Sequence, residues 1–301
     1  MRPCTPTAPP QAGIALISVL WVLALLTVIA SALSFSVRNE TKFARNVIAS
    51  AQARHAAEGG IYLAVERLLT RAAQPRPDYA AYEFVVGQAH VRAVISDEAG
   101  KIDLNAAPPE LLDGLLRSAG VEAWQRANIV DAILDWRDAD QVTRINGAED
   151  REYRAGGKDY GAKDARFDSV DELKLVLGMS PQLFRKIRPA LTVHSQQRGI
   201  NPAAASRLVL LGIPGMGPDT VDAYLRLRSE RDDSGLPPPP PPSIDGRFRA
   251  SATGSVYTIR SRARLGDGIA AELAATVTLR DAAERGFTIM SWDDETQLSG
   301  T

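Results

Sequence analysis

The sequence predicts an α+β protein in which a long N-terminal helix packs on an antiparallel sheet, with a large all-α domain inserted between the strands. An uncharged apolar run extends from Ile14 to Val37. Strand-like alternation occurs in residues 82–95 and again in residues 255–290, and helical periodicity fills residues 105–228 between them. Strands at both ends of a chain with helices between them are typical of a helical insertion into a sheet.

The overall composition is that of an ordinary globular protein. Hydrophobic residues make up 45% and charged residues 24% of the 301 residues, which is enough chain for one large domain or two smaller ones. The formal net charge of -1 provides no overall basic field for nucleic acid. Cys4 is the only cysteine, so an intramolecular disulfide is excluded.

The apolar run is the first element. As a helix, about 24 residues at a rise of 1.5 Å reach roughly 36 Å, which is enough to cross a bilayer. A cleaved secretory signal would have a shorter apolar region of about 7–15 residues, although Ala30-Ser31-Ala32 imitates a cleavage site. A plain signal anchor is the second alternative, and a prepilin leader is the third.

The residues around Gly13 favour the third alternative. Gly13 followed by Ile14-Ala15-Leu16-Ile17 resembles the site at which prepilin peptidase cuts after glycine and methylates the new terminal amine. The resemblance implies an N-methylated Ile14. The fifth residue from Ile14 is Ser18, where most pilins carry a glutamate whose buried charge needs a partner on the next subunit. In lacking this glutamate, the chain resembles the K-type minor pseudopilins, which occupy the filament tip.

The helix is expected to continue beyond the membrane with one apolar face. This face comprises Phe43, Val47, Ile61, Val65, Leu68 and Leu69. Glycine is a poor helix former, so Gly59-Gly60 could mark a bend.

Strand patterns follow the helix at residues 82–86 and 90–95, with Gly87-Gln88-Ala89 as the turn between them. Further strand patterns near the C-terminus cover residues 255–264, 274–279 and 287–290, with Gly266-Asp267-Gly268 as a hairpin turn. The polyproline tract of residues 237–242 is expected to be a stiff spacer where the chain returns to the sheet.

Helix signals lie between the two sets of strands. Asn105 is a candidate cap with Pro108 or Pro109 in the first turn, and Ser169 with Glu172 forms a capping box. Apolar faces are expected from Leu111, Leu112, Leu115 and Leu116 and from Ile129, Val130, Ile133, Leu134 and Trp136. Trp124 and Trp136 are both predicted to lie in the core.

Residues 211–218, Leu-Gly-Ile-Pro-Gly-Met-Gly-Pro, resemble the hairpin of a helix-hairpin-helix element. Gly215 and Gly217 would let backbone amides approach a phosphate, so DNA binding is an alternative. Asp219 and Asp222 would repel a phosphate there, and no basic cluster accompanies the motif. A compact join between two short helices is therefore favoured.

An acidic motif covers residues 135–140, Asp-Trp-Arg-Asp-Ala-Asp, and residues 146–150, Asn-Gly-Ala-Glu-Asp. Carboxylates around a glycine-containing loop supply the oxygen ligands that calcium requires, although the spacing is not that of an EF-hand. The alternative is a solvated acidic loop whose charges pair with Arg137, Arg144 and Arg151. The spacing alone leaves both open.

No enzyme is predicted. Asp138 with Glu149 could in principle act as acid and base, but no nucleophile elbow, nearby histidine or metalloprotease motif accompanies them. The three histidines, His55, His90 and His194, lie far apart in the sequence and have no ligand spacing.

The chain as a whole resembles the general secretion pathway protein K family of type II secretion systems, most strongly at residues 13–26, 135–150 and 211–228. The resemblance implies a pilin-like fold whose inserted domain is of the helix-hairpin-helix or SAM-like kind, without a nucleic-acid role. The implied divisions are a leader at 1–13, a transmembrane helix at 14–37, a pilin-like helix and first strands at 38–102, the insertion at 103–236, and a proline-rich loop with the last strands at 237–301.

The same resemblance implies a calcium ion in the inserted domain. The residues that match the family motif and are expected as ligands are Asp138, Asp140, Asn146, Glu149 and Asp150. A metal would also stabilise a long loop in a protein without disulfides.

The resemblance further implies a single-pass inner-membrane protein with its body in the periplasm, in agreement with Arg2 on the cytoplasmic side. It would be cut by prepilin peptidase and would bind the I-type and J-type minor pseudopilins, then the H-type and the major pseudopilin. It would cap the pseudopilus and nucleate its assembly for export across the outer membrane. A membrane-tethered helix-hairpin-helix DNA-binding protein and a minor pilin of a type IV pilus are the alternatives.

Overall fold

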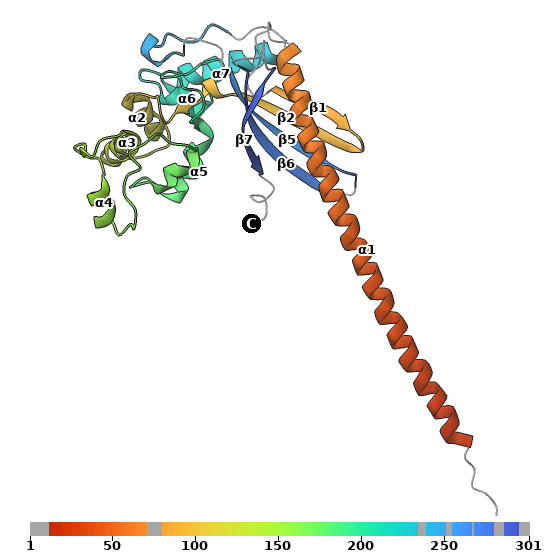
Figure 1. Cartoon of the computed structure of the whole chain (residues 1–301). Coiled ribbons are helices and arrows are strands. Elements are labelled where there is room, and N and C mark those ends of the chain that lie inside the picture. The colour runs from red at the N-terminus through yellow and green to blue at the C-terminus, as the bar shows by residue number, and fades with distance from the viewer. Residues whose placement is uncertain are drawn as a thin grey trace, which may run out of the picture.

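The computed structural model describes residues 12–70, 80–233, 239–250, 255–266, 268–279 and 286–294. Most of the predicted leader, the start of the polyproline tract and Asp267 lie outside the described residues. The first element is α1, a helix of 59 residues from Ala12 to Thr70, whose first half projects away from the rest of the molecule (Figure 1).

α1 runs straight through Gly59 and Gly60, so the expected bend is wrong (Figure 1). A Cβ at position 60 would lie 2.4 Å from Val91 Cγ1 and 2.5 Å from Ser261 Oγ, which are impossible contacts. Gly60 is therefore required where the helix approaches the sheet most closely, and the tertiary contact outweighs its low helix propensity.

Five antiparallel strands form one sheet in the order β1-β2-β5-β6-β7. The strands are β1 (Ala80–Val86), β2 (Ala89–Asp97), β5 (Val256–Arg264), β6 (Ala270–Thr278) and β7 (Thr288–Asp294). Gly87 joins β1 to β2 with a φ of 60°, a conformation that favours glycine, and this confirms the first predicted hairpin.

One face of the sheet packs on α1 and the other does not. In β2, Val91, Ala93 and Ile95 are buried while Arg92 between them is exposed. The helix contributes mostly small residues to this core, which lets it lie close to the strands. The buried helix residues are Ala49, Ala53, Ala56, Ala57, Ile61, Ala64, Val65 and Leu68.

The insertion, defined here as residues 98–250 between β2 and β5, lies on the other side of the sheet from α1 (Figure 1). Its α-helices are α2 (Pro109–Ser118), α3 (Ala123–Arg137), α4 (Asp150–Ala155), α5 (Pro181–Ile187), α6 (Arg207–Gly212) and α7 (Pro218–Asp233). Its 3₁₀ helices are η1 (Glu98–Gly100), η2 (Val170–Leu175), η3 (Arg188–Ala190) and η4 (Gly246–Phe248).

The insertion is not purely helical. β3 (Ile102–Asp103) and β4 (Leu191–Thr192) form a two-stranded parallel sheet within it. Such short strands give no periodic signal, so the sequence pattern could not reveal them.

Two predicted helix starts differ in detail from the structure. The capping box at Ser169 is present, with Glu172 Oε1 accepting from Ser169 N at 3.3 Å, but it begins a 3₁₀ helix. The cap of α2 is Pro108, whereas Asn105 bonds across to the backbone of Phe167 at 2.8 and 2.9 Å.

The insertion has a hydrophobic core of its own, separate from the core between α1 and the sheet. Trp136 lies in it as predicted, stacked on Phe167 and in tilted contact with Tyr153. Trp124 is 70% exposed, so its prediction as core is wrong. It lies in the first turn of α3, and the buried part of that helix starts only at Ile129.

A buried ion pair connects the insertion to the sheet. The Glu98 carboxylate contacts Lys101 Nζ at 2.5 Å and accepts from Thr258 Oγ1 on β5 at 2.7 Å. Burial alone would raise the pKa of Glu98, but Lys101 and the threonine hydroxyls around the carboxyl lower it below its usual value. Glu98 is therefore a fixed anion at the joint.

Candidate functional site

The first half of α1 is apolar and uncovered. Its large side chains from Leu16 to Phe35 are more than half exposed, with Trp21 at 74%. Within the described residues α1 is the one helix long and apolar enough to cross a membrane, with a mean hydropathy of 2.6 in its most apolar window. This helix fits a single-pass membrane anchor. Gly13 and Ile14 lie in its first turns.

A second uncovered apolar surface lies between the membrane segment and the sheet. Phe43 is 71% exposed, and Val47 and Ile48 are also more than half exposed. The helical spacing predicted that Phe43, Val47 and Ile61 share one apolar face. In the structure Ile61 is buried against the sheet, whereas Phe43 and Val47 are exposed. We call Phe43, Val47 and Ile48 the helix collar. The chain itself supplies no cover for it among the described residues.

The acidic motif of the insertion folds around Asp135, at the end of α3. The fully buried Asp135 carboxylate accepts from Ala148 N at 2.9 Å and from Arg144 Nη1 at 2.5 Å. A Cβ at Gly147 would lie 1.9 Å from Asp135 Oδ2, so only glycine fits at that position. These contacts bring the chain back across α3 and place Glu149 beside its end.

Buried carboxylate oxygens lie behind this loop. Oδ1 of Asp138 and Oδ1 of Asp164 have no hydrogen-bond partner among the described residues, and the Glu149 carboxylate, which faces Glu152 N in the capping box of α4, has no side-chain donor there. Glu149 is only 4% exposed. Burial and then the neighbouring carboxylates, Asp164 foremost, raise the pKa of Glu149 to about 7. A proton or a cation is needed between the Glu149 and Asp164 carboxyls at neutral pH.

The other expected ligands lie elsewhere. Asp140 is exposed, and its Oδ1 accepts from Val142 N at 2.9 Å. Asn146 bonds to Asp131 Oδ2 through its backbone and side-chain nitrogens at 3.2 and 3.0 Å. Asp150 Oδ2 pairs with Arg154 at 2.8 Å.

The charge pairing expected of the acidic loop is present in part. Arg144 pairs with Asp135 and Asp138, and Arg151 pairs with Glu152. Arg137 instead donates to the backbone oxygens of Leu104 and Ala107 at 2.5 and 3.0 Å. Arg144 and Arg151 therefore pair with some carboxylates of this region, whereas no cation pairs with Glu149 among the described residues.

The donor set at Glu149 fits a hard cation only after rearrangement. Within the described chain, no group of three or more histidine, cysteine, aspartate or glutamate side chains is close enough to hold a metal ion. The oxygens of Asp138, Glu149 and Asp164 are nevertheless the type that calcium prefers, and Asp164 and Asp138 both lie near enough to raise the pKa of Glu149. The sequence missed Asp164, for which the only signal is a positive φ of 53°, visible in the structure alone.

The predicted hairpin joins α6 to α7, with Gly215 at a φ of 85°. Asp222 on α7 pairs with Arg207 Nε at 2.7 Å and Nη2 at 3.0 Å. The hairpin joins two helices, and the acid on α7 does not favour DNA binding.

An anchor helix that is exposed at its start and packed on an antiparallel sheet at its end defines a pilin-like membrane subunit. Family models support this class. The model of type II secretion system (T2SS), protein K matches residues 91–196, and that of the PilX N-terminal region matches residues 12–61.

Curated relatives lead to the particular family. Type II secretion system protein K of Klebsiella pneumoniae is 29% identical over 226 residues, covering 67% of this chain and 69% of that protein. The Aeromonas hydrophila protein of the same name is 26% identical over 305 residues, covering 87% and 91%. The family model and these relatives make the chain similar to the type II secretion system K proteins, and they support its identification as a minor pseudopilin of that system.

A solved structure shares the fold. The crystal structure of the GspK-GspI-GspJ complex from enterotoxigenic Escherichia coli contains a chain that matches with a TM-score of 0.57 and 16% identity, covering 85% of this chain and 98% of that one. This likeness supports a long N-terminal helix combined with an antiparallel sheet.

Proposed function

We propose that this minor pseudopilin occupies the tip of the pseudopilus and nucleates its assembly together with the I-type and J-type minor pseudopilins. The observation that carries the proposal is the helix collar with the apolar half of α1 below it, a surface that sister helices would cover. A relative with this fold was solved in the GspK-GspI-GspJ complex. The H-type and the major pseudopilin would follow below.

The insertion explains why the subunit belongs at the end of a filament. It extends sideways from the sheet on the side opposite α1 (Figure 1). A subunit with such a projection would clash with its neighbours inside a shaft. We propose the divisions 38–102, 103–236 and 237–301 for the body. The middle division, which makes up most of the insertion, is of the helix-hairpin-helix or SAM-like kind and lies between the two pilin-like parts.

Replacing Phe43 and Val47 together with serine is expected to weaken the ternary assembly at least about 10-fold, since each buried side chain contributes roughly 1.5–3 kcal/mol. Co-purification of the full chain with I-type and J-type subunits in detergent measures this. Replacing Trp124 and Leu227, which are equally exposed on the insertion, is the matched control and should leave the yield unchanged. Equal yields from both double variants would contradict the proposal.

We also propose that prepilin peptidase removes residues 1–13, so that the mature chain starts at an N-methylated Ile14 and is anchored once in the inner membrane with its body in the periplasm. Mass spectrometry of the purified chain is expected to show this terminus and no Cys4. An intact Met1 would contradict processing without affecting the proposed position at the tip, whereas a terminus after Ala32 would contradict both, because it removes most of the apolar half of α1.

We propose further that the insertion binds calcium through Asp138, Glu149 and Asp164. Asp140, Asn146 and Asp150 would join only if the loop turned them inward. Bound calcium would supply positive charge between carboxylates that otherwise repel one another. Its role is structural, because it would connect the end of α3, the start of α4 and the loop that carries Asp164.

A further inference from the structure

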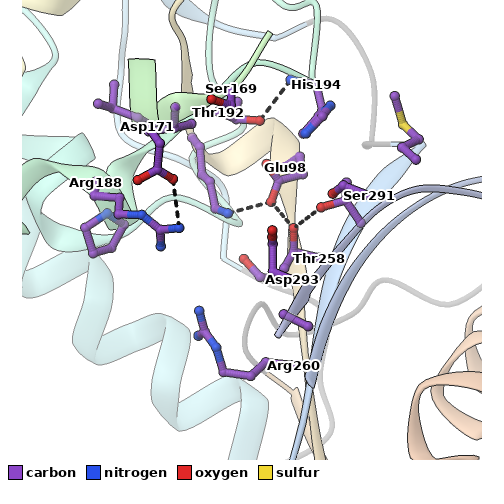
Figure 2. Close-up of a pocket in the computed structure, with 18 of the residues that line it drawn as sticks. Glu98, Ser169, Asp171, Arg188, Thr192, His194, Thr258, Arg260, Ser291 and Asp293 are labelled. Carbon is purple, nitrogen blue, oxygen red and sulfur yellow. Dashed lines mark hydrogen bonds and ion pairs between the residues drawn. The ribbon is translucent and has the colours of Figure 1, made fainter. Parts of the chain in front are cut away.

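The face of the sheet turned away from α1 has two halves with different surroundings. Towards the insertion, this face forms one wall of a cavity of about 310 Å³, to which Thr258 and Ser291 contribute (Figure 2). The half that lies towards the β1–β2 and β5–β6 turns instead carries charged side chains exposed to solvent. Neither the membrane anchor nor the acidic loop uses this second half, so the proposed functions leave its charges unexplained.

The strand register places four basic side chains together on this half of the face. Arg92 of β2 lies directly opposite Arg262 of β5, and His90 lies directly opposite Arg264. Opposite residues of antiparallel strands have Cβ atoms about 5 Å apart, and alternate residues of one strand are about 7 Å apart. All four side chains are exposed. We call these four residues the basic corner.

One row of the basic corner is flanked by acids on both sides. Glu83 on β1 lies opposite Arg92. Glu272 on β6 lies opposite Arg262, with Arg262 Nε 4.0 Å from Glu272 Oε2, which is a long contact for an ion pair. A carboxylate that arrives above β2 and β5 would therefore meet arginines first, with the two acids to either side.

The other row has no acid beside it. His90 lies opposite Val85 of β1, and Arg264 lies opposite Ala270 of β6. Val85 is 70% exposed. Within the described part of the chain, the side chains of Arg92 and Arg264 have neither an ion-pair nor a hydrogen-bond partner. A guanidinium has five N–H donors, so the basic corner combines available donors with an exposed apolar side chain, and arginine is enriched in protein interfaces.

We propose that the basic corner binds an acidic surface of a neighbouring protein subunit, with a carboxylate held between Arg92 and Arg264 and an apolar side chain placed on Val85. The two arginines are diagonal neighbours about 7–8 Å apart, a distance that long side chains can bridge. Arg–carboxylate pairs are frequently bidentate. Like charges directly opposite one another destabilise a sheet, and a carboxylate between them would relieve this repulsion. The interface shares no residue with the helix collar or with the proposed calcium ligands.

The level of the basic corner argues against lipid headgroups as its ligand. Ser261, next to Arg262, meets α1 at Gly60. Gly60 follows Arg38, the first charge after the apolar run, by about 22 residues, or roughly 33 Å of helix. Arg264 lies further along β5 by about 10 Å at most. Headgroup charges are screened over about 10 Å, so they do not reach this level.

The test uses the full chain in neutral detergent with a chelator and a rhodamine-labelled hexaglutamate peptide, with binding measured by fluorescence anisotropy at low salt. Replacing Arg92 and Arg264 together with glutamine is expected to lower the affinity at least about 10-fold. Replacing Arg117 and Arg185, exposed arginines of the insertion, with glutamine removes the same charge and should change the affinity less than about 2-fold. Glu83→Gln, which removes an acid beside Arg92, should strengthen binding by about 2-fold.

Three outcomes would overturn the proposal. These are no binding by the unaltered chain, an equal loss in the two double variants, and displacement of the peptide by inorganic phosphate or a short-chain phosphatidylglycerol as readily as by free hexaglutamate at the same charge concentration. The Arg92 and Arg264 double variant removes repulsion between strands, so it is expected to melt no lower than the unaltered chain. If it does melt lower, Arg264→Gln alone repeats the test, and full affinity in that single variant would contradict the proposal.

Discussion

Replacing Gly114 with alanine is expected to lower the free energy of unfolding of the insertion by about 3 kcal/mol or more. A Cβ at this position would lie 1.7 Å from the backbone oxygen of Gly212, so α2 and α6 would have to separate. The two helices are also joined by Ser118 Oγ, which donates to Leu208 O at 3.0 Å. The blocking atom belongs to the backbone, and no rotamer change can relieve the clash.

The expected loss of stability is informative, because replacing a glycine inside a helix with alanine normally stabilises the protein. In the interior of α2, glycine-to-alanine alone would stabilise by roughly 0.5–1 kcal/mol. Gly217→Ala is the control, since no described atom lies within 4 Å of a Cβ there, and it should cost at most about 1 kcal/mol, because alanine is a poorer residue than glycine before the first turn of α7. Urea unfolding followed by the fluorescence of the buried Trp136 measures both. A Gly114→Ala variant as stable as the unaltered chain would show that α2 and α6 do not touch in this way.

Gly60 and Gly114 show which part of the fold could be predicted from patterns in the sequence and which part could not. Local periodicity predicted α1, the β1–β2 hairpin and the helical faces, because those signals depend on neighbouring residues. Whether a glycine is a weak point or a contact depends on what faces it. Val91 and Gly212 are distant in the sequence, so both close approaches were hidden.

The start of β6 shows a related limit. The pattern placed this strand at residues 274–279, yet it begins at Ala270. Its first residues, Ala-Ala-Glu-Leu, have a higher helical than strand propensity. Pairing with β5 over nine residues imposes the strand conformation on them.

The candidate metal site was predictable only where its residues are close in sequence. Asp138 and Glu149 belong to one short motif, and the structure places them at the end of α3 and the start of α4, where Asp138 helps to raise the pKa of Glu149. Asp164 comes from a later loop with no periodic pattern, and the fold alone brings it to Glu149. Asp135 was visible as part of the motif, but its role as the buried acceptor that shapes the loop required coordinates.

Without calcium, the chain is expected to lose stability as the pH rises from about 4.5 to about 7. The folded pKa of Glu149, about 7, lies above its usual value of 4.5. The folded state therefore binds this proton more tightly than the unfolded state, and the advantage is complete at low pH and lost above pH 7. The difference amounts to about 3 kcal/mol. Calcium needs the ionised carboxylate, so its stabilising effect should grow across the same pH window.

Glu149→Gln separates these contributions, because it removes the charge and nearly preserves the shape. At about pH 8 with a chelator, the variant is expected to melt at a higher temperature than the unaltered chain, since no carboxylate has to ionise against Asp164 and the amide can donate to it. With calcium at about 100 times its dissociation constant, the unaltered chain should gain roughly 2.7 kcal/mol and the variant almost nothing. Glu83→Gln, an exposed change on β1, should keep the full calcium response. A Glu149→Gln variant that melts at a lower temperature in chelator would mean that Glu149 is held by donors outside the carboxylate cluster. A variant that responds to calcium as strongly as the unaltered chain would mean that calcium binds elsewhere.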